Sequence, residues 1–217
     1  MRERFGLVAM CLGLNVGCVG ASRPHVIVGS ADKQTKACEE AARTRSSGKT
    51  KHSYGNCVPE AWRHVINHKR ASEGLPLISE EELLKDGIEG EYLVNRPGQY
   101  NHGASSPPEI VKLLASDKYG IVADVKKQTI DDIVAAVLTN RAVSISIHPY
   151  HFGSYVDDGW FHEVAVSGIA FDPDGQLDGI VINDSGLGAC GLVLSMDDYN
   201  KDYYDGALMT VSRDPQW

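Results

Sequence analysis

The stretch Tyr54-Gly55-Asn56-Cys57-Val58-Pro59-Glu60-Ala61-Trp62 contains a cysteine at the point where a helix must begin. Proline lacks an N–H group and fixes φ, so Pro59 fits only the first turn of a helix. Apolar residues then recur with the spacing of one helix face, at Val58, Ala61, Trp62, Val65 and Ile66. The N–H groups and the dipole at a helix start stabilise a thiolate. The stretch therefore predicts a helix from about Cys57, with a reactive thiol in its first turn.

The rest of the chain predicts more helices and then strands. Helix caps stand at Ser79 with Glu82, at Ser106 with Pro107 and Glu109, and at Thr129 with Asp132. We expect Gly87 to end the first of these three helices. β-rich runs follow at 142–148, 163–171, 179–182 and 207–211. Helices followed by mostly antiparallel strands predict an α+β fold.

The hairpin between the two middle runs links a histidine with an aspartate. Asp172-Pro173-Asp174-Gly175 predicts a type I turn with Gly175 in a left-handed bulge. Counting back from this turn places residue 162 opposite residue 186. Asp184 is then the diagonal neighbour of His162 on one face, about 7–8 Å away between backbones, and Asn183 points the other way. The alternatives are a solvated histidine and aspartate, and a buried structural role for Cys57.

Taken in order, these residues resemble the papain-like cysteine peptidases, in particular the bacterial branch that processes bacteriocins. The resemblance covers roughly residues 51–213 and rests on the segments 54–59, 162–168 and 182–184. It implies a papain-like fold, in which N-terminal helices that carry the cysteine pack on a mostly antiparallel sheet that carries His and Asp. It also implies acyl transfer without a cofactor or metal, with Cys57 as nucleophile, His162 as base and Asp184 orienting the histidine.

One departure from that family leaves other functions open. The family usually has a glutamine six residues before the cysteine, in the oxyanion hole, where this chain has Lys51. A catalytically inactive binding domain is therefore an alternative, as are a peptidoglycan amidase and a glutamine-deamidating toxin-like enzyme. A metal-binding module is a further alternative, because His148 and His151 form an H-x-x-H pair, with His102 elsewhere. Zinc needs three or four ligands, and the pair follows a strand, so a loop near a substrate cleft is favoured.

The N-terminus predicts an export signal. Arg2 and Arg4 precede an apolar run at 5–14 and small residues up to Ala21, a layout typical of signal peptides and too short to span a bilayer. We expect cleavage after Ala21; lipidation at Cys18 and an unstructured leader are the alternatives. The chain then divides into a signal peptide (1–21), a polar leader (22–50) and a hydrolase domain (51–217), and the protein is expected to be secreted or periplasmic.

The composition of the chain limits the classes of partner that we expect and the expected oxidation state of its cysteines. The 217 residues are 42% hydrophobic, which suits one domain with a sizeable core. The net charge of −8, with one short basic run at 49–51, argues against nucleic acid and leaves a peptide or protein substrate as the expected partner. Removal of the signal leaves Cys38, Cys57 and Cys190. An exported chain can pair two of them, so we expect a Cys38–Cys190 disulfide and a free Cys57.

Overall fold

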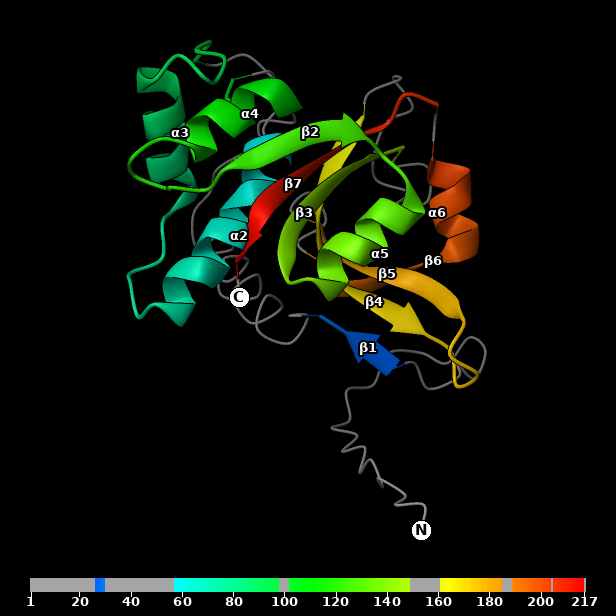
Figure 1. Cartoon of the computed structure of the whole chain (residues 1–217). Helices are drawn as coiled ribbons and strands as arrows, with labels where there is room; N and C mark the ends of the chain where they lie inside the picture. The colour runs from blue at the N-terminus through cyan, green and yellow to red at the C-terminus, as the bar shows by residue number, and fades with distance from the viewer. Residues whose placement is uncertain are drawn as a thin grey trace.

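The computed structural model describes residues 26–29, 57–97, 102–148, 161–184, 189–203 and 205–216. Within these residues, five helices and a seven-stranded sheet form an α+β fold (Figure 1). The predicted signal peptide and Lys51 lie outside them. No helix in the described part of the chain is long and apolar enough to cross a bilayer.

All strand pairs in the sheet are antiparallel. The strands are β1 (Val26–Val28), β2 (Ala123–Lys127), β3 (Arg141–Ile147), β4 (His162–Phe171), β5 (Leu177–Asp184), β6 (Ala189–Ser195) and β7 (Leu208–Pro215). Their order is β2-β7-β3-β4-β5-β6, so the last strand of the chain inserts beside β3. β4 pairs with β3 near its start and with β1 near its end. The polar leader of the sequence analysis thus contributes a strand to the sheet.

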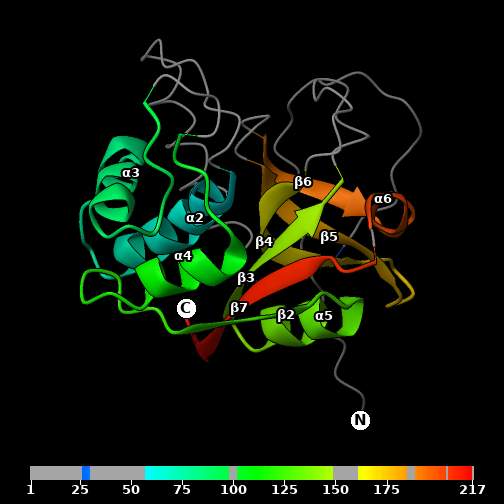
Figure 2. The same ribbon diagram turned by 90° about the horizontal axis from the view of Figure 1, so that it is seen from above.

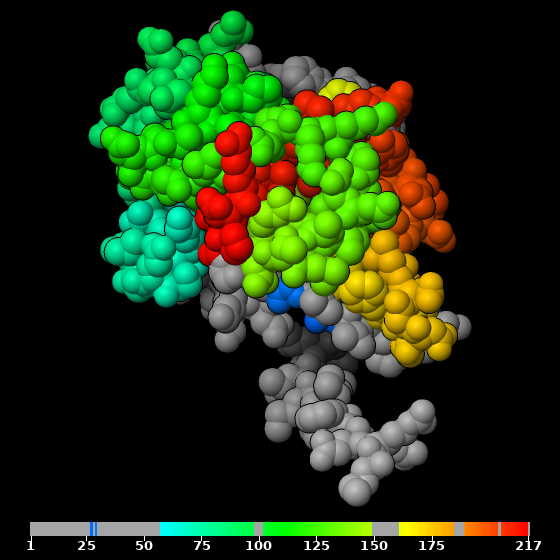
Figure 3. Space-filling model, in the orientation of Figure 1, coloured from blue at the N-terminus to red at the C-terminus, as the bar shows by residue number. Residues whose placement is uncertain are grey.

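The helices divide between a helical lobe and the sheet. They are α2 (Cys57–Ser72), α3 (Glu80–Glu89), α4 (Pro107–Leu114), α5 (Ile130–Leu138) and α6 (Met196–Asp202). Helices α2, α3 and α4 group on one side of the molecule, while α5 and α6 lie against the strands (Figures 1 and 2). In the space-filling view, α5 covers much of the sheet on the face that is shown (Figure 3).

Two hydrophobic cores lie on opposite faces of the sheet. One joins α5 and α6 to strand residues that include Val143, Val164 and Ile182. The other lies among α2, α3 and α4 and includes Trp62 and Ala142. Because side chains alternate along a strand, Ala142 and Val143 point to opposite faces of β3. The second core holds α2 on the sheet, where it packs on β4.

The predicted helix starts are confirmed, but one predicted end is wrong. Ser79 caps α3 and Thr129 caps α5 through their side chains, and Ser106 forms a capping box with Glu109. Gly87, however, lies inside α3, which continues to Glu89. A Cβ atom at Gly87 would lie 2.4 Å from Leu93 side-chain atoms. This glycine therefore allows Leu93 to pack closely on the helix.

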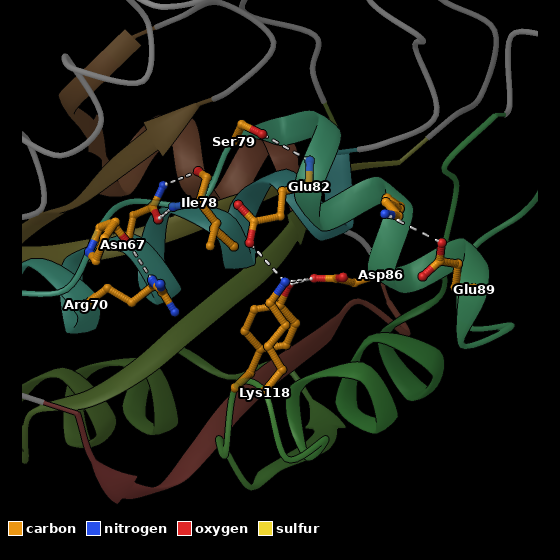
Figure 4. A network of polar contacts seen from close by, with 11 residues as sticks. Asn67, Arg70, Ile78, Ser79, Glu82, Asp86, Glu89 and Lys118 are labelled. Atoms are coloured by element: carbon orange, nitrogen blue, oxygen red, sulfur yellow. Dashed lines mark hydrogen bonds and ion pairs between the residues drawn. The ribbon is translucent and has the colours of Figure 1, made fainter.

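Polar contacts fix α2 relative to α3 (Figure 4). The buried Asn67 side chain donates to the Ile78 carbonyl (3.0 Å) and accepts from the Ile78 N–H (2.8 Å). Lys118 binds Glu82 and Asp86 at the surface, at 2.9 and 2.6 Å. Exposed ion pairs contribute about 0–1 kcal/mol, whereas breaking a buried hydrogen bond costs about 1–3 kcal/mol. Asn67 therefore holds α2 to the start of α3 more strongly than Lys118 holds α3 to the segment after α4.

The β4–β5 hairpin has the predicted turn and the predicted register at its open end. The Gly175 N–H donates to the Asp172 carbonyl (3.0 Å), and Gly175 has a φ of 80°. Near the open end, Ala165 lies opposite Asn183. By continuation, Asp184 is the diagonal neighbour of His162.

Candidate active site

The structure brings together the three residues predicted to form the site. Cys57 is the first residue of α2, His162 the first of β4 and Asp184 the last of β5. The distance between His162 Nε2 and Asp184 Oδ1 is 2.8 Å. His162 also forms a side-chain hydrogen bond with Cys57. The imidazole therefore lies between the thiol and the carboxylate.

The three side chains differ in exposure. Asp184 is 0% and His162 6% exposed, whereas Cys57 is half-buried and a free thiol. A buried carboxylate can hold the imidazole in one orientation. Cys57, as the most exposed of the three residues, is the one that a substrate can reach.

The electrostatics of the site favour a protonated imidazole. Burial lowers the pKa of His162, but hydrogen bonds to Asp184 and Cys57 and the negative charges of both groups outweigh burial. The pKa of His162 rises from 6.5 to about 10.

Asn183 does not take part in the triad. Its Oδ1 accepts a hydrogen bond from the Gly191 N–H on β6 (2.9 Å), and its side chain is fully buried. Strand alternation thus separates the two neighbours, with Asp184 toward His162 and Asn183 away from it. The residue bonded to His162 is thus Asp184 and not Asn183, while the role of Asp184 in a reaction stays a prediction.

An exposed aromatic ring lies beside the histidine. Phe161, directly before His162, is 53% exposed, and its ring centroid lies 5.1 Å from that of His148 at the end of β3. The His148 N–H donates to the Asp202 carbonyl (2.9 Å), which ties this corner to α6. Phe161 thus presents an apolar surface one residue before His162.

The possible metal ligands of the sequence analysis are only partly described by the structure, which includes His102 and His148. His151 lies outside the described residues. His102 is occupied by the Arg96 N–H, which donates to its Nδ1 (3.1 Å). The described segments contain no group of three or more His, Cys, Asp or Glu residues that could hold a metal ion.

Glu163, directly after His162, is a buried acid that the sequence analysis did not single out. Ser144 Oγ donates to its Oε1 (2.6 Å) and Ser146 Oγ to its Oε2 (2.7 Å). Burial raises the pKa of Glu163 to about 7, although both serines and the charge of His162 lower it. The sequence signal is two serines that alternate with Val143, Ile145 and Ile147. Such a pattern predicts a solvated face unless a helix covers it.

The cysteines behave in part as expected. Cys190 is disulfide-bonded and Cys57 is free. Cys38, the predicted partner of Cys190, lies outside the described residues, so the pairing stays a prediction.

No protein-family model matches the sequence, and no curated protein matches it. A thiol, an imidazole and a carboxylate joined in series are the groups that acyl transfer by a nucleophile requires.

Proposed function

We propose that this chain is a papain-like cysteine hydrolase that cleaves or transfers acyl groups of peptide or amide substrates. The observation that carries the proposal is the position of His162, which is hydrogen-bonded both to Cys57 and to Asp184. A histidine held by a buried carboxylate is the usual base for a thiol or hydroxyl nucleophile. The α+β fold, with the cysteine on a helix and the other two residues on adjacent strands, supports the same reading.

Each residue has one task in the proposed reaction. The Cys57 thiolate attacks the carbonyl carbon, and a C–S bond forms as the carbonyl π electrons move to oxygen. The His162 imidazolium gives its proton to the leaving amine, which departs and leaves a thioester on Cys57. Neutral His162 then takes a proton from water, whose oxygen attacks the thioester and releases the acid. Asp184 keeps the imidazole oriented and balances its charge in each step.

The developing oxyanion needs hydrogen-bond donors. The first N–H groups of a helix have no acceptor inside the helix, and Cys57 opens α2. We assign its backbone N–H to the oxyanion, because it is close to the carbon that the sulfur attacks. The position of the usual glutamine is Lys51, which lies outside the described residues, so a second donor is not assigned.

The proposed compartment is outside the cytoplasm of a bacterium. A disulfide at Cys190 supports it, since structural disulfides persist in oxidising compartments. The proposed signal peptide at 1–21 leads to the same place. A free Cys57 beside His162 then serves catalysis rather than cross-linking.

A substrate panel tests this proposal. The wild-type protein and C57A are incubated with peptide libraries, peptidoglycan fragments and glutamine-containing proteins, and products are read by mass spectrometry. We expect turnover of at least one amide class by the wild type and none by C57A, with a thioester adduct on Cys57 in quenched samples. Turnover by C57A at the wild-type rate would contradict the proposal, and which class is turned over separates peptidase, amidase and deamidase.

A further inference from the structure

Two serines of the neighbouring strand β3, Ser144 and Ser146, hold the Glu163 carboxylate between them and are called the clamp below. Glu163 is 2% exposed, and each of its two oxygens accepts a hydrogen bond from a different serine of β3. Ser146 is its partner in the strand register, and Ile147 is the partner of His162. The clamp therefore binds β4 at the residue directly after the proposed catalytic histidine.

Glu163 can change its charge with pH because the two serines can form hydrogen bonds with both its ionised and its protonated form. The ionised carboxylate accepts one hydrogen bond from each serine hydroxyl. The protonated acid must donate one hydrogen bond, so one of the two hydroxyls has to turn and accept. A serine hydroxyl can do either, which makes both states possible without unfolding.

His162 is the charged group whose charge acts on Glu163 in the structure, where it lowers the pKa of the acid. The interaction is reciprocal, so ionised Glu163 stabilises the His162 cation. Other elements packed on β4 also carry titratable groups. These groups include Asp184 on β5, Arg141 on β3, Asp131 and Asp132 on α5, and, on α2, Cys57, the buried pair Glu60–Arg63, and the buried His64 and His68.

We propose that Glu163 is a positioning residue for His162. The ionised carboxylate of Glu163 stabilises the His162 imidazolium and, through it, the Cys57–His162 pair. This rests on the proposed role of the triad. It adds a second carboxylate, on the opposite side of β4 from His162, to the one that Asp184 supplies. When Glu163 loses its proton, the imidazolium of the Cys57–His162 pair is therefore stabilised.

The first test follows the His162 ring by NMR in protein with labelled histidine, with H162Q to assign the signal. In the wild type, we expect the His162 signal to shift in a step near pH 7, as Glu163 ionises. The isosteric variant E163Q should lack this step. Its His162 should also lose its own proton about tenfold more readily, because a nearby negative charge is gone.

Serine variants test the clamp without removing the acid. Each serine hydrogen bond lowers the pKa of Glu163, so S146A should move the step to higher pH. S167A is the matched control. Like Ser146, Ser167 is a buried serine of the sheet, but it lies on β4 and donates to the Val181 carbonyl (3.2 Å). Its loss should therefore leave the step in place.

The outcomes separate this inference from the function on which it rests. The rate of Cys57 alkylation is measured in the same variants. If H162Q alkylates at the wild-type rate, the triad itself is wrong. If H162Q is slow but E163Q has the wild-type His162 titration, only the role of Glu163 is overturned. A step that S146A and S167A move equally also overturns it.

Discussion

Burial and hydrogen bonding shift the pKa of His162 in opposite directions. Burial opposes its charge, while Asp184 and Cys57 favour it, and the second effect is larger. Because the folded pKa lies above the ordinary 6.5, this group stabilises the fold fully below pH 6.5. That contribution is lost as pH rises through about 10. A buried imidazolium also needs its carboxylate, because removing one partner of a buried pair leaves the other charge uncompensated.

Asp184 and Asn183 should therefore respond differently to substitution. D184A should lower kcat/KM strongly, but roughly one to two orders of magnitude less than C57A, because the aspartate orients and does not transfer protons. N183A should act mainly on stability, since Asn183 binds the Gly191 N–H on β6. Both variants are compared with the wild type on a substrate from the panel, with urea unfolding alongside. A greater loss of kcat/KM in N183A would contradict the assigned roles.

Glu163 should make stability depend on pH in the opposite way to an ordinary surface acid. Burial raises its pKa from 4.5 to about 7. The folded state therefore loses stability as pH rises from about 4.5 to about 7, and the cost is full above that. At pH 8, E163Q should be more stable than the wild type by up to about 3 kcal/mol, and the gain should shrink toward zero at pH 4. Urea unfolding at both pH values measures this, and a gain independent of pH would contradict it.

Sequence reasoning reached Cys57, His162 and Asp184 because local rules position each of them. A proline in the first turn places the cysteine, and a turn motif places the other two. Glu163 was not reached, since Ser144 and Ser146 alternate with apolar residues as on a solvated face. Only the packing of α2 on β4, a contact between distant parts of the chain, buries that face.

At the scale of elements, the β4–β5 hairpin holds two irregularities that cancel. Ser167 is an extra residue on β4, and Asp178 is an extra residue on β5. Between them the register is shifted by one, and beyond them it returns. Counting back from the turn without a bulge inside either strand therefore gives the observed neighbour for His162. A single bulge would have placed Asn183 on the face of His162.

Gly87 in α3 gives a test of packing against helix propensity. G87A gains about 1 kcal/mol of helix propensity, but its Cβ would meet Leu93 at 2.4 Å. Overpacking costs about 1–3 kcal/mol, so we expect a net loss in urea unfolding. In G87A/L93A the clash is absent, and the double variant should lose less than the sum of the single losses. A G87A protein more stable than the wild type would show that Leu93 moves away freely.

The elements that the sequence did not predict are mostly at the edges of the sheet. β2 (Ala-Asp-Val-Lys-Lys) and β6 are the outermost strands, and most of their side chains are only partly buried. An edge strand has little apolar alternation because one side faces solvent, and charged residues there are common. β1 has three residues, and its pairing with β4 depends on a partner far along the chain.

At the scale of the whole molecule, the triad joins the helical lobe to the sheet. Cys57 comes from α2, held by the core around Trp62, and the other two residues come from β4 and β5. The reactive geometry therefore depends on the packing of α2 on β4. Substitutions that loosen this packing are expected to reduce activity before the protein unfolds.

The disulfide of Cys190 is also a property of the whole chain. Non-reducing peptide mapping of exported protein should find Cys190 linked to Cys38. Without reductant, iodoacetamide should label Cys57 alone, because Cys57 is free and half-buried. N-terminal sequencing of the same sample should begin at Ser22, after the proposed signal peptide. Alkylation of both Cys38 and Cys190 without reductant would contradict the pairing.

The central claim is that Cys57 and His162 act as one unit, and the alkylation rate of Cys57 at pH 6 tests it most directly. An ordinary cysteine with a pKa of about 8.5 is about 0.3% ionised at that pH. A thiolate held by the His162 cation should react far faster, so a pulse of iodoacetamide followed by mass spectrometry should show H162Q to be slower than the wild type by about a hundredfold. C57A should take up no label in the same pulse. Equal rates in the wild type and H162Q would mean that the histidine does not activate the thiol.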